Sequence, residues 1–475
     1  KRRRHRRRKR KALAIEEEKK DFCQRIIGSL RNFYNETGGI TTWKMTHGWD
    51  RNTDQLHKWS GIGIGTGNDS YRSTHSLPHI KEIVLPSNGI GGPWRRPFRT
   101  LLPLICNTLT TLRLSGNKLS GNIPRCIGTC KELTILSLND NEITGELPLC
   151  LNQLTKLRVL NLRQNNIEGF ASIAFMLKSL VSLNLSENNF SGALNLADLC
   201  NMEHLEDLDL SYNSFAGSFF TPSVCKALEA RIVRIRLSRN DFNGIIPDDI
   251  RQCVNLTSLT LDGNRFSGPI PDGLCALTSL QRLWLADNDF QGNLPEKIGR
   301  LRNLRTFDIG GNSFGPSVPA SIGKLRKLSV LRFDRNSFVG FLPFDEIKKM
   351  SLLEEMSYVG NEYLDPHMLE TLKEFALENN IHLDRRDNWD QFYPDPCDPA
   401  SESEDDEGGQ TKKDHASMKK KKNLLQSETG SGDDEADGID ESDDEGDEST
   451  GEESSEESST SSTNNETSSE STSGN

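Results

Sequence analysis

The stretch Leu256-Thr-Ser-Leu259-Thr-Leu261-Asp-Gly-Asn264 carries the pattern that decides the fold. The same pattern, LxxLxLxxN, stands at residues 109–117, and its closing Asn recurs at intervals of 23 to 29 residues. A period of this length and regularity indicates a stack of repeats rather than a single compact core. Twelve units follow from the closing asparagines, which are Asn88, Asn117, Asn141, Asn165, Asn188, Asn213, Asn240, Asn264, Asn288, Asn312, Asn336 and Asn361.

Each unit alternates apolar and polar residues, as a half-buried strand does. One unit has too little apolar surface to fold alone, so its Leu residues must pack against those of the next unit, with the strands side by side in one parallel sheet. The closing Asn would point inward, and its amide would bond to the backbone of its own coil and the adjoining coil. This predicts a structural ladder of Asn117, Asn141, Asn165, Asn188, Asn213, Asn240, Asn264, Asn288, Asn312 and Asn336.

A second signature follows the closing Asn. Gly stands four residues later in ten units, where it permits a positive φ without steric cost, and Pro stands seven residues later in seven units. The resulting phrase, Asn264-Arg-Phe-Ser-Gly-Pro-Ile-Pro271, resembles the plant-type leucine-rich repeat, NxFSGxIP, and the resemblance covers residues 80–361. It implies an α/β repeat solenoid: a curved right-handed leucine-rich-repeat superhelix with a parallel concave β-sheet, short convex helical turns and disordered charged ends.

The segment before the repeats resembles the amino-terminal cap of plant-type and protist repeat proteins. Within residues 21–79, the run 30–39 and the tryptophans Trp43, Trp49 and Trp59 carry this resemblance. Such a cap covers the apolar end of a repeat stack. The cysteines that land-plant caps have around Trp59 are absent, which puts a disulfide-stapled cap, and with it secretion, in doubt.

The twelve repeats are assigned to residues 80–362, and residues 363–397 are predicted to cap the other end. Asp365-Pro366 combines a favourable residue for the position before a helix with Pro at its first position. A short helix with one apolar face is therefore expected to seal the last coil.

Both ends of the chain are strongly charged. Residues 1–20 hold twelve Lys or Arg and three Glu, a net charge of +9, whereas residues 401–475 hold 24 Asp or Glu and six Lys, a net charge of −18. We expect a basic disordered head over 1–20 and an acidic, Ser-rich disordered tail over 398–475, because neither can bury apolar surface. The head suits contact with nucleic acid or an anionic membrane, a nuclear import signal, or the cytosolic flank of a membrane span.

No catalytic set, cofactor motif or metal-ligand cluster can be read from the sequence, so no enzyme, cofactor or metal is predicted. Gly61-Ile-Gly-Ile-Gly65 resembles a phosphate loop but lacks the preceding long strand and the following helix, which favours a cap loop. Seven of the ten cysteines fall nine to thirteen residues after a repeat Asn. These convex positions predict small buried side chains at Cys126, Cys130, Cys150, Cys200, Cys225, Cys253 and Cys275.

The concave face is the default interaction surface of a solenoid. Its outward positions lie six, four and two residues before each closing Asn, and in the later units they carry charges and one Trp. A Trp beside an Arg is typical of an interface hot spot, whereas the alternative is that Trp284 packs on Arg stems and the charges only solvate the face. The run Phe219-Phe220 is read either as a side bulge or as repeat drift. The candidate partner-binding residues are Asp207, Asp209, Arg234, Arg236, Arg282, Trp284, Asp308 and Arg332.

Two functions remain open from the sequence. The first is a non-enzymatic recognition or scaffold module that binds a protein or peptide on its concave and lateral faces, as part of a receptor-like protein that is membrane-associated or extracellular. The alternative is a nuclear protein that binds histones or other basic proteins, because repeats followed by an acidic tail resemble the acidic leucine-rich nuclear phosphoproteins in layout.

Overall fold

The computed structural model describes residues 2–49, 55–64 and 79–383. All of them belong to the first of two compact units, residues 1–388. The predicted acidic tail, residues 398–475, and the end of the predicted carboxy-terminal cap lie outside the described residues. Within the described ranges, no helix is both long and apolar enough to cross a bilayer.

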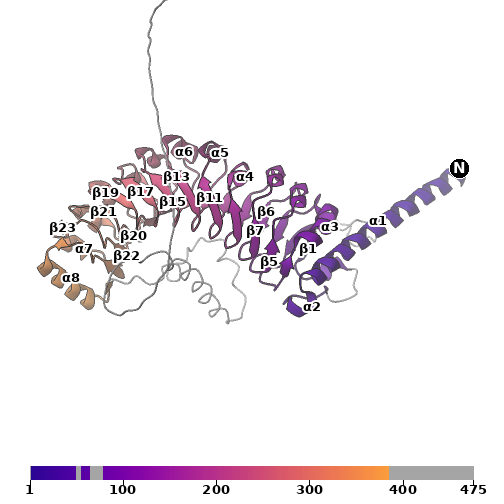
Figure 1. Ribbon diagram of the computed structural model, residues 1–475, viewed down its shortest axis with the longest axis horizontal. Coiled ribbons are helices and arrows are strands. Elements are labelled where there is room, and N and C mark those ends of the chain that lie inside the picture. Colours follow the sequence, from indigo (N-terminus) through magenta and orange to yellow (C-terminus); the bar gives the residue numbers. More distant parts are fainter. Residues whose placement is uncertain (1, 50–54, 65–78, 384–475) are drawn as a thin grey trace, which may run out of the picture. The chain divides into compact units, whose positions relative to one another are not determined.

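The predicted α/β repeat solenoid is confirmed, and its main feature is a 14-stranded sheet to which each coil adds one strand (Figure 1). Every pairing in this sheet is parallel except that of β1 with β2. Neighbouring strands are one coil apart in sequence, as the spacing of the closing asparagines predicts. The strands are β1 Ile62–Ile64, β2 Ile80–Val84, β4 Thr111–Arg113, β6 Ile135–Ser137, β8 Val159–Asn161, β10 Ser182–Asn184, β12 Asp207–Asp209, β14 Arg234–Arg236, β16 Ser258–Thr260, β18 Arg282–Trp284, β20 Thr306–Asp308, β22 Val330–Arg332, β24 Glu355–Ser357 and β26 His382–Leu383.

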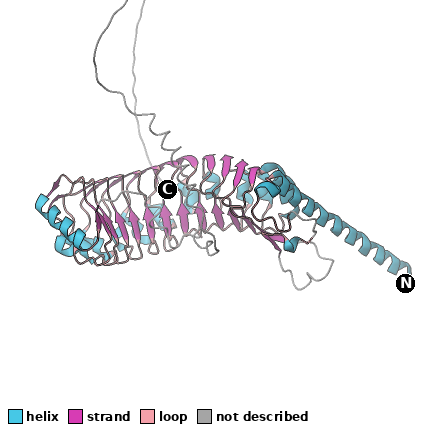
Figure 2. Ribbon diagram, turned by 90° about the horizontal axis from the view of Figure 1, so that it is seen from below, coloured by secondary structure: helices cyan, strands magenta, loops and turns pink. Residues whose placement is uncertain are grey.

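A second sheet of ten short parallel strands follows the closing asparagines, and Figure 2 shows its strands as a separate row. The sequence pattern did not predict these strands, because their short segments contain Gly, a poor strand former. The positive φ expected at that Gly is confirmed, for example 80° at Gly121. The strands are β3 Gly91–Pro93, β5 Lys118–Gly121, β7 Glu142–Gly145, β9 Asn166–Gly169, β11 Asn189–Ala193, β13 Ser214–Ser218, β15 Asp241–Gly244, β17 Arg265–Gly268, β19 Asp289–Gly292 and β21 Ser313–Phe314, and β23 Val339–Gly340 pairs separately with β25 Tyr363–Leu364.

Short helices return the chain to the next strand. Where the repeat Pro is present it usually precedes a 3₁₀ turn, as Pro247 precedes η4. Among the coils without this Pro, those of Asn165, Asn188 and Asn213 form α-helices instead. The return elements are α3 Arg95–Ile105, η2 Arg125–Thr129, η3 Leu149–Gln153, α4 Ser172–Phe175, α5 Leu196–Cys200, α6 Pro222–Ala227, η4 Asp248–Gln252, η5 Leu274–Ala276, η6 Glu296–Arg300, η7 Ala320–Lys324 and α7 Phe344–Ile347.

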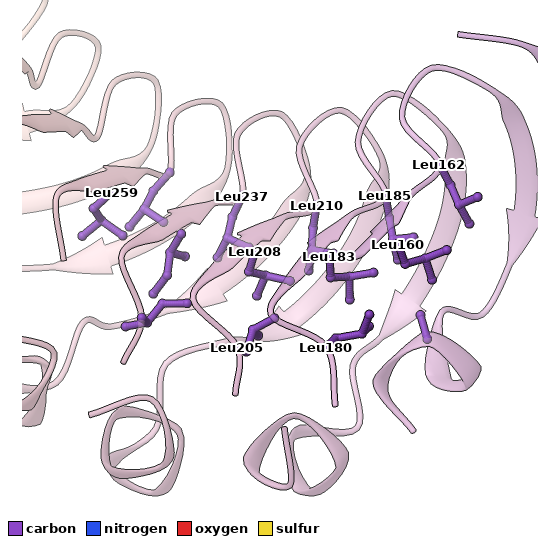
Figure 3. Packing of buried hydrophobic residues seen from close by; sticks show 14 of the residues in the cluster. Leu160, Leu162, Leu180, Leu183, Leu185, Leu205, Leu208, Leu210, Leu237 and Leu259 are labelled. Atoms are coloured by element: carbon purple, nitrogen blue, oxygen red, sulfur yellow. The ribbon is translucent and has the colours of Figure 1, made fainter. Parts of the chain in front are cut away.

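The interior is a continuous column of apolar side chains, most of them Leu, from corresponding positions of successive coils. Figure 3 shows the strand leucines, such as Leu183 and Leu208, pointing into this column, and both are fully buried. The Phe of the repeat phrase forms a second column, in which Phe242, Phe266 and Phe290 stack with ring centroids 6.4 and 6.3 Å apart. Phe219 and Phe220 are also buried, so the hypothesis of a side bulge is wrong. These two rings fill space beside the Phe column.

The ladder of closing asparagines ties each coil to the one before it. The Asn264 side-chain amide donates to the carbonyl oxygens of Leu237 and Leu261, both at 2.9 Å, and its Oδ1 accepts from the Phe242 N–H at 3.0 Å. The other nine predicted ladder residues make the corresponding bonds. Backbone N–H and C=O groups that the turn leaves outside the hydrogen bonds of the β-sheet find their partners in these Asn side chains.

The basic head differs from the expectation of a disordered segment. Helix α1 runs from Arg2 to Glu36 without interruption. The reason is local: Arg, Lys, Ala, Leu and Glu are good helix formers, and neither Pro nor Gly occurs before Gly28. The last turns of α1 are anchored, because Ile26 and Leu30 are buried in the hydrophobic core of the solenoid.

The two caps are built around aromatic and apolar clusters. In the first, Trp43, Trp49 and Trp59 are buried, with the ring centroids of Trp49 and Trp59 4.8 Å apart. The short helices α2 Gly39–Thr42 and η1 Leu56–Lys58 directly precede Trp43 and Trp59 in the chain. At the other end, the predicted helix is present as α8 Pro366–Glu378, and the Asp365 carboxylate accepts from the Met368 N–H at 2.8 Å.

Candidate partner-binding face

The exposed side of the 14-stranded sheet, called here the strand face, carries the candidate residues in two adjacent rows. The strand register fixes these rows, because each strand residue is paired with its counterpart one coil away. All eight candidates lie in the rows. The first row reads Asp207, Arg234, Ser258, Arg282, Thr306, Val330 and Glu355, and the second reads Asp209, Arg236, Thr260, Trp284, Asp308, Arg332 and Ser357.

An ion-pair cluster occupies the part of the strand face formed by β12 and β14. Asp207 lies 2.9 Å from Arg234 and 3.2 Å from Arg236, and Arg236 also lies 3.8 Å from Asp209. Burial raises the pKa of the Asp209 carboxyl, and the neighbouring Arg236 opposes this shift. These four candidates therefore compensate one another, so a partner would meet a polar but nearly neutral surface here.

Trp284 is the aromatic centre of the strand face. The guanidinium carbon of Arg282 lies 5.0 Å from its ring centroid, and its indole N–H donates to the Thr306 hydroxyl at 3.0 Å. The Trp284 ring therefore packs on an Arg side chain, as the alternative to a binding role predicted. Both Arg282 and Trp284 nevertheless stay only half-buried, which leaves part of the ring available to a partner.

A second charged cluster lies beside Trp284 on β20 and β22. The pKa of Asp308 is raised to about 7, mainly by burial and to a smaller extent by nearby Asp334 and Asp262, whereas the Gly310 N–H and Arg332 oppose the shift. Arg332 is itself buried. This carboxyl therefore changes charge near neutral pH.

The sequence missed the partner of Arg332. Its Nε donates to Glu355 Oε1 at 2.8 Å, and a second guanidinium nitrogen contacts the same oxygen. Glu355 stands six residues before Asn361, so the repeat alignment alone would have found it. With this pair formed, Arg332 is held in place rather than offered to a partner.

The sequence also missed a cavity on the helical side of the coils, between η6 and η7. Its volume is ≈ 660 Å³. The signal was present in the sequence as two clusters of Lys and Arg, over residues 297–305 and 324–327. Lining residues include Lys297, Arg300, Arg302, Asn303, Ser321 and Lys324.

The cysteines and acidic groups offer no visible metal chemistry. No group of three or more His, Cys, Asp or Glu in the described ranges could hold a metal ion. Of the seven convex cysteines, Cys130, Cys225, Cys253 and Cys275 are buried as predicted, while the other three are only half-buried. Burial raises the pKa of the Cys130 thiol to about 12, which makes it a poor nucleophile.

Comparisons with known families and structures agree with this geometry. A leucine-rich repeat region model matches residues 271–390, and two leucine-rich repeat models match residues 107–167, 155–215 and 255–277. A comparison of the sequence with curated proteins finds no match.

Among solved structures, the chain is similar to the plant peptide hormone receptor RGFR1 in complex with RGF2, with 27% identity, a TM-score of 0.51, and coverage of 58% of this chain and 46% of that one. It is also similar to a TDR receptor, with 26% identity, a TM-score of 0.54, and coverage of 61% and 49%. The chain therefore spans about half the length of these two receptors. A plant ice-binding protein shares the fold at 22% identity and a TM-score of 0.53, with coverage of 67% and 96%. The chain belongs to the leucine-rich-repeat proteins, and its repeats are of the plant type.

Proposed function

We propose that this chain is a non-enzymatic recognition module that binds a protein or peptide on its strand face, within a receptor-like protein. The observation that carries the proposal is the pair of in-register rows around Trp284. No described helix packs over these rows, whereas helices cover the other side of the coils (Figure 1). Solenoids generally use such a surface for partners.

The chemistry of the strand face favours an extended peptide with one apolar or aromatic side chain. Trp284 and Arg282 offer a flat, partly exposed contact of the type that dominates interface energies. Ser258 and Thr260 are both buried and have small side chains, so the strand face beside the Trp284 ring is recessed. A peptide side chain placed on the Trp284 ring would therefore meet charged groups on one side and small ones on the other.

The solved complex of RGFR1 with RGF2 supports a peptide-binding role, because that receptor shares the repeat architecture at 27% identity. The comparisons lend no support to the nuclear, histone-binding alternative. The acidic tail on which that alternative depends lies outside the described residues. Contact of the basic head with nucleic acid or an anionic membrane stays a separate proposal, which rests on the exposed cations of α1.

Selection of peptides from a random display library against the full chain tests the proposal. Hydrogen–deuterium exchange with and without a selected peptide would then locate the contact. We expect slower exchange in strands β12 to β22, since a bound peptide covers their outward side chains and hinders local opening of the sheet. Slower exchange confined to the return helices η2 to η7, or no selected peptide at all, would contradict a binding role for the strand face.

A further inference from the structure

The cavity between η6 and η7 lies on the helical side of the coils, away from the strand face. Its volume of ≈ 660 Å³ falls in the range of sites for small organic ligands. Its lining contains four cations and one acid, Glu296, and no aromatic or aliphatic side chain. A cavity of this size with such a lining suits a polar, negatively charged ligand rather than an apolar one.

Close approach of two coils forms one wall of the cavity. A Cβ atom at Gly299 would lie 2.2 Å from the Ser321 carbonyl oxygen and 3.2 Å from Lys324 Cδ. Gly at this position therefore lets η6 and η7 come together. The stem of Lys324 passes close to this wall, while the residue as a whole stays exposed.

The cations of the cavity are only partly neutralised. Lys297 pairs with Asp272 at 2.5 Å, which lies one coil away. In the part of the chain that the structure describes, Arg300 and Arg302 form no ion pair, although both are exposed and close to the same opening. Two guanidinium groups without a carboxylate partner favour an oxyanion, because their planar donors match its oxygens.

An unused hydroxyl group gives a second, independent indication. Ser321 Oγ is buried and has no hydrogen-bond partner among the described residues, yet Ser321 lines the cavity. Buried polar groups normally have a partner. Because this oxygen has almost no accessible surface, a ligand bonds to it only once the Ser321 side chain rotates towards the opening. The neighbouring Asn303 is already held, since its amide donates to the Thr278 carbonyl oxygen at 2.9 Å and its Oδ1 accepts from Lys327 at 2.8 Å.

We propose that this cavity binds a small polyanion that carries phosphate or sulfate groups. Arg300, Arg302 and Lys324 supply the charge-assisted hydrogen bonds, and Ser321 donates its hydroxyl hydrogen to one ligand oxygen. The cavity is open to solvent and leaves room for more than a single phosphate ion, so a ligand with a ring or sugar-sized body and several anionic groups fits it. The site is separate from the strand face and does not depend on the proposed peptide-binding role.

Isothermal titration calorimetry of the full chain with inositol hexakisphosphate and with sucrose octasulfate tests this site. At about 0.15 M salt, we expect binding of at least one probe, and its affinity should fall at least about tenfold in the Arg300→Gln, Arg302→Gln double variant. The Ser321→Ala variant should lose about threefold to tenfold, because it removes a single hydrogen bond to a charged group. Binding of the phosphate probe alone would assign a phosphate ester, and binding of both would assign a site directed by charge.

Two controls separate this site from other basic surfaces. Arg251 is an exposed Arg on the equivalent turn η4, so Arg251→Gln should leave the affinity unchanged. Changing Arg6, Arg7 and Arg8 of α1 to Gln should likewise leave the Arg300-dependent binding in place. Binding that is lost with these head substitutions but retained in the Arg300→Gln, Arg302→Gln variant would overturn the proposal, as would the absence of binding by both probes.

Discussion

Arg282 lies against the ring of Trp284, with its guanidinium carbon 5.0 Å from the ring centroid, and the two residues share strand β18. They stand two residues apart, so both side chains point to the same side of the sheet. The contact orients the indole, and the hydrogen bond of its N–H to Thr306 fixes the ring across two coils. An aromatic ring held in this way presents a rigid contact, which lowers the entropy lost when a partner binds.

The Leu column predicts a large effect for a single truncation in its centre. Leu261 is fully buried, and Leu261→Ala should lower the free energy of unfolding by about 2–5 kcal/mol, because the cavity that it leaves cannot collapse completely. Chemical denaturation measures this change. The exposed Leu352 offers a matched control, for which the same substitution should cost far less. Equal losses for the two variants would show that the column is not the main source of stability.

The Asn ladder predicts a cost of a different kind. In Asn264→Ala the N–H of Phe242 loses its side-chain acceptor in a buried setting. The carbonyls of Leu237 and Leu261 each lose one of two amide donors and keep those of Asn240 and Asn288. The unsatisfied N–H alone costs about 1–3 kcal/mol, so the variant should be clearly destabilised although it removes few apolar atoms. Thermal unfolding tests this against Asn122→Ala, which removes an exposed side chain of the same type. A small loss in both variants would argue against the ladder as a structural element.

The raised pKa of Asp308 predicts a pH-dependent stability. Its folded-state pKa of about 7 lies above the ordinary value of 3.8, so the unfolded chain releases this proton more easily than the folded chain. The charged Asp308 carboxylate therefore destabilises the folded state, with its full effect above about pH 7. This destabilisation disappears as the pH falls towards 4. Asp308→Asn keeps the acceptor for the Gly310 N–H, whose bond to Asp308 is 3.0 Å long, and removes the charge.

Thermal unfolding of Asp308→Asn at several pH values measures this effect. At pH 8 the variant should unfold about 2–4 °C above the unmodified protein, and the difference should shrink towards pH 4. Asp289 is exposed at the start of β19 in the second sheet, so Asp289→Asn is the control. Its difference in unfolding temperature from the unmodified protein should not shrink towards pH 4 in this way. A destabilised Asp308→Asn at pH 8 would mean that attraction to Arg332 outweighs burial.

The buried pair of Arg332 and Glu355 predicts non-additive behaviour. Arg332→Ala leaves the Glu355 carboxylate without its partner, and should cost about 3–5 kcal/mol of unfolding free energy. Glu355→Ala removes this partner from the buried Arg332, which keeps its attraction to Asp308. The double variant should cost clearly less than the sum of the two single ones, and a double-mutant cycle by chemical denaturation measures the difference. Additive losses would show that the pair contributes nothing as a pair.

The repeat period was enough to predict the strands, the Leu column and the inward position of residues such as Asn264, because all three follow from one spacing. The same alignment placed Trp284 and Asp308 on one face. It could not predict which charges are compensated, because the pairing of Asp207 with two Arg side chains depends on rotamers and burial. The cavity at Ser321 was missed for a related reason: its cations come from two coils, and only the stacking of η6 on η7 brings them together.

The binding affinity of Trp284→Ala for a peptide selected on the full chain is the most direct test of the strand face. Because a central aromatic anchor carries a large share of interface energy, we predict a loss of about tenfold or more, with most of the thermal stability retained. Lys178→Ala, an exposed change on the helical side, should bind as the unmodified protein does. An unchanged affinity in Trp284→Ala, or a loss that merely parallels unfolding, would contradict the account.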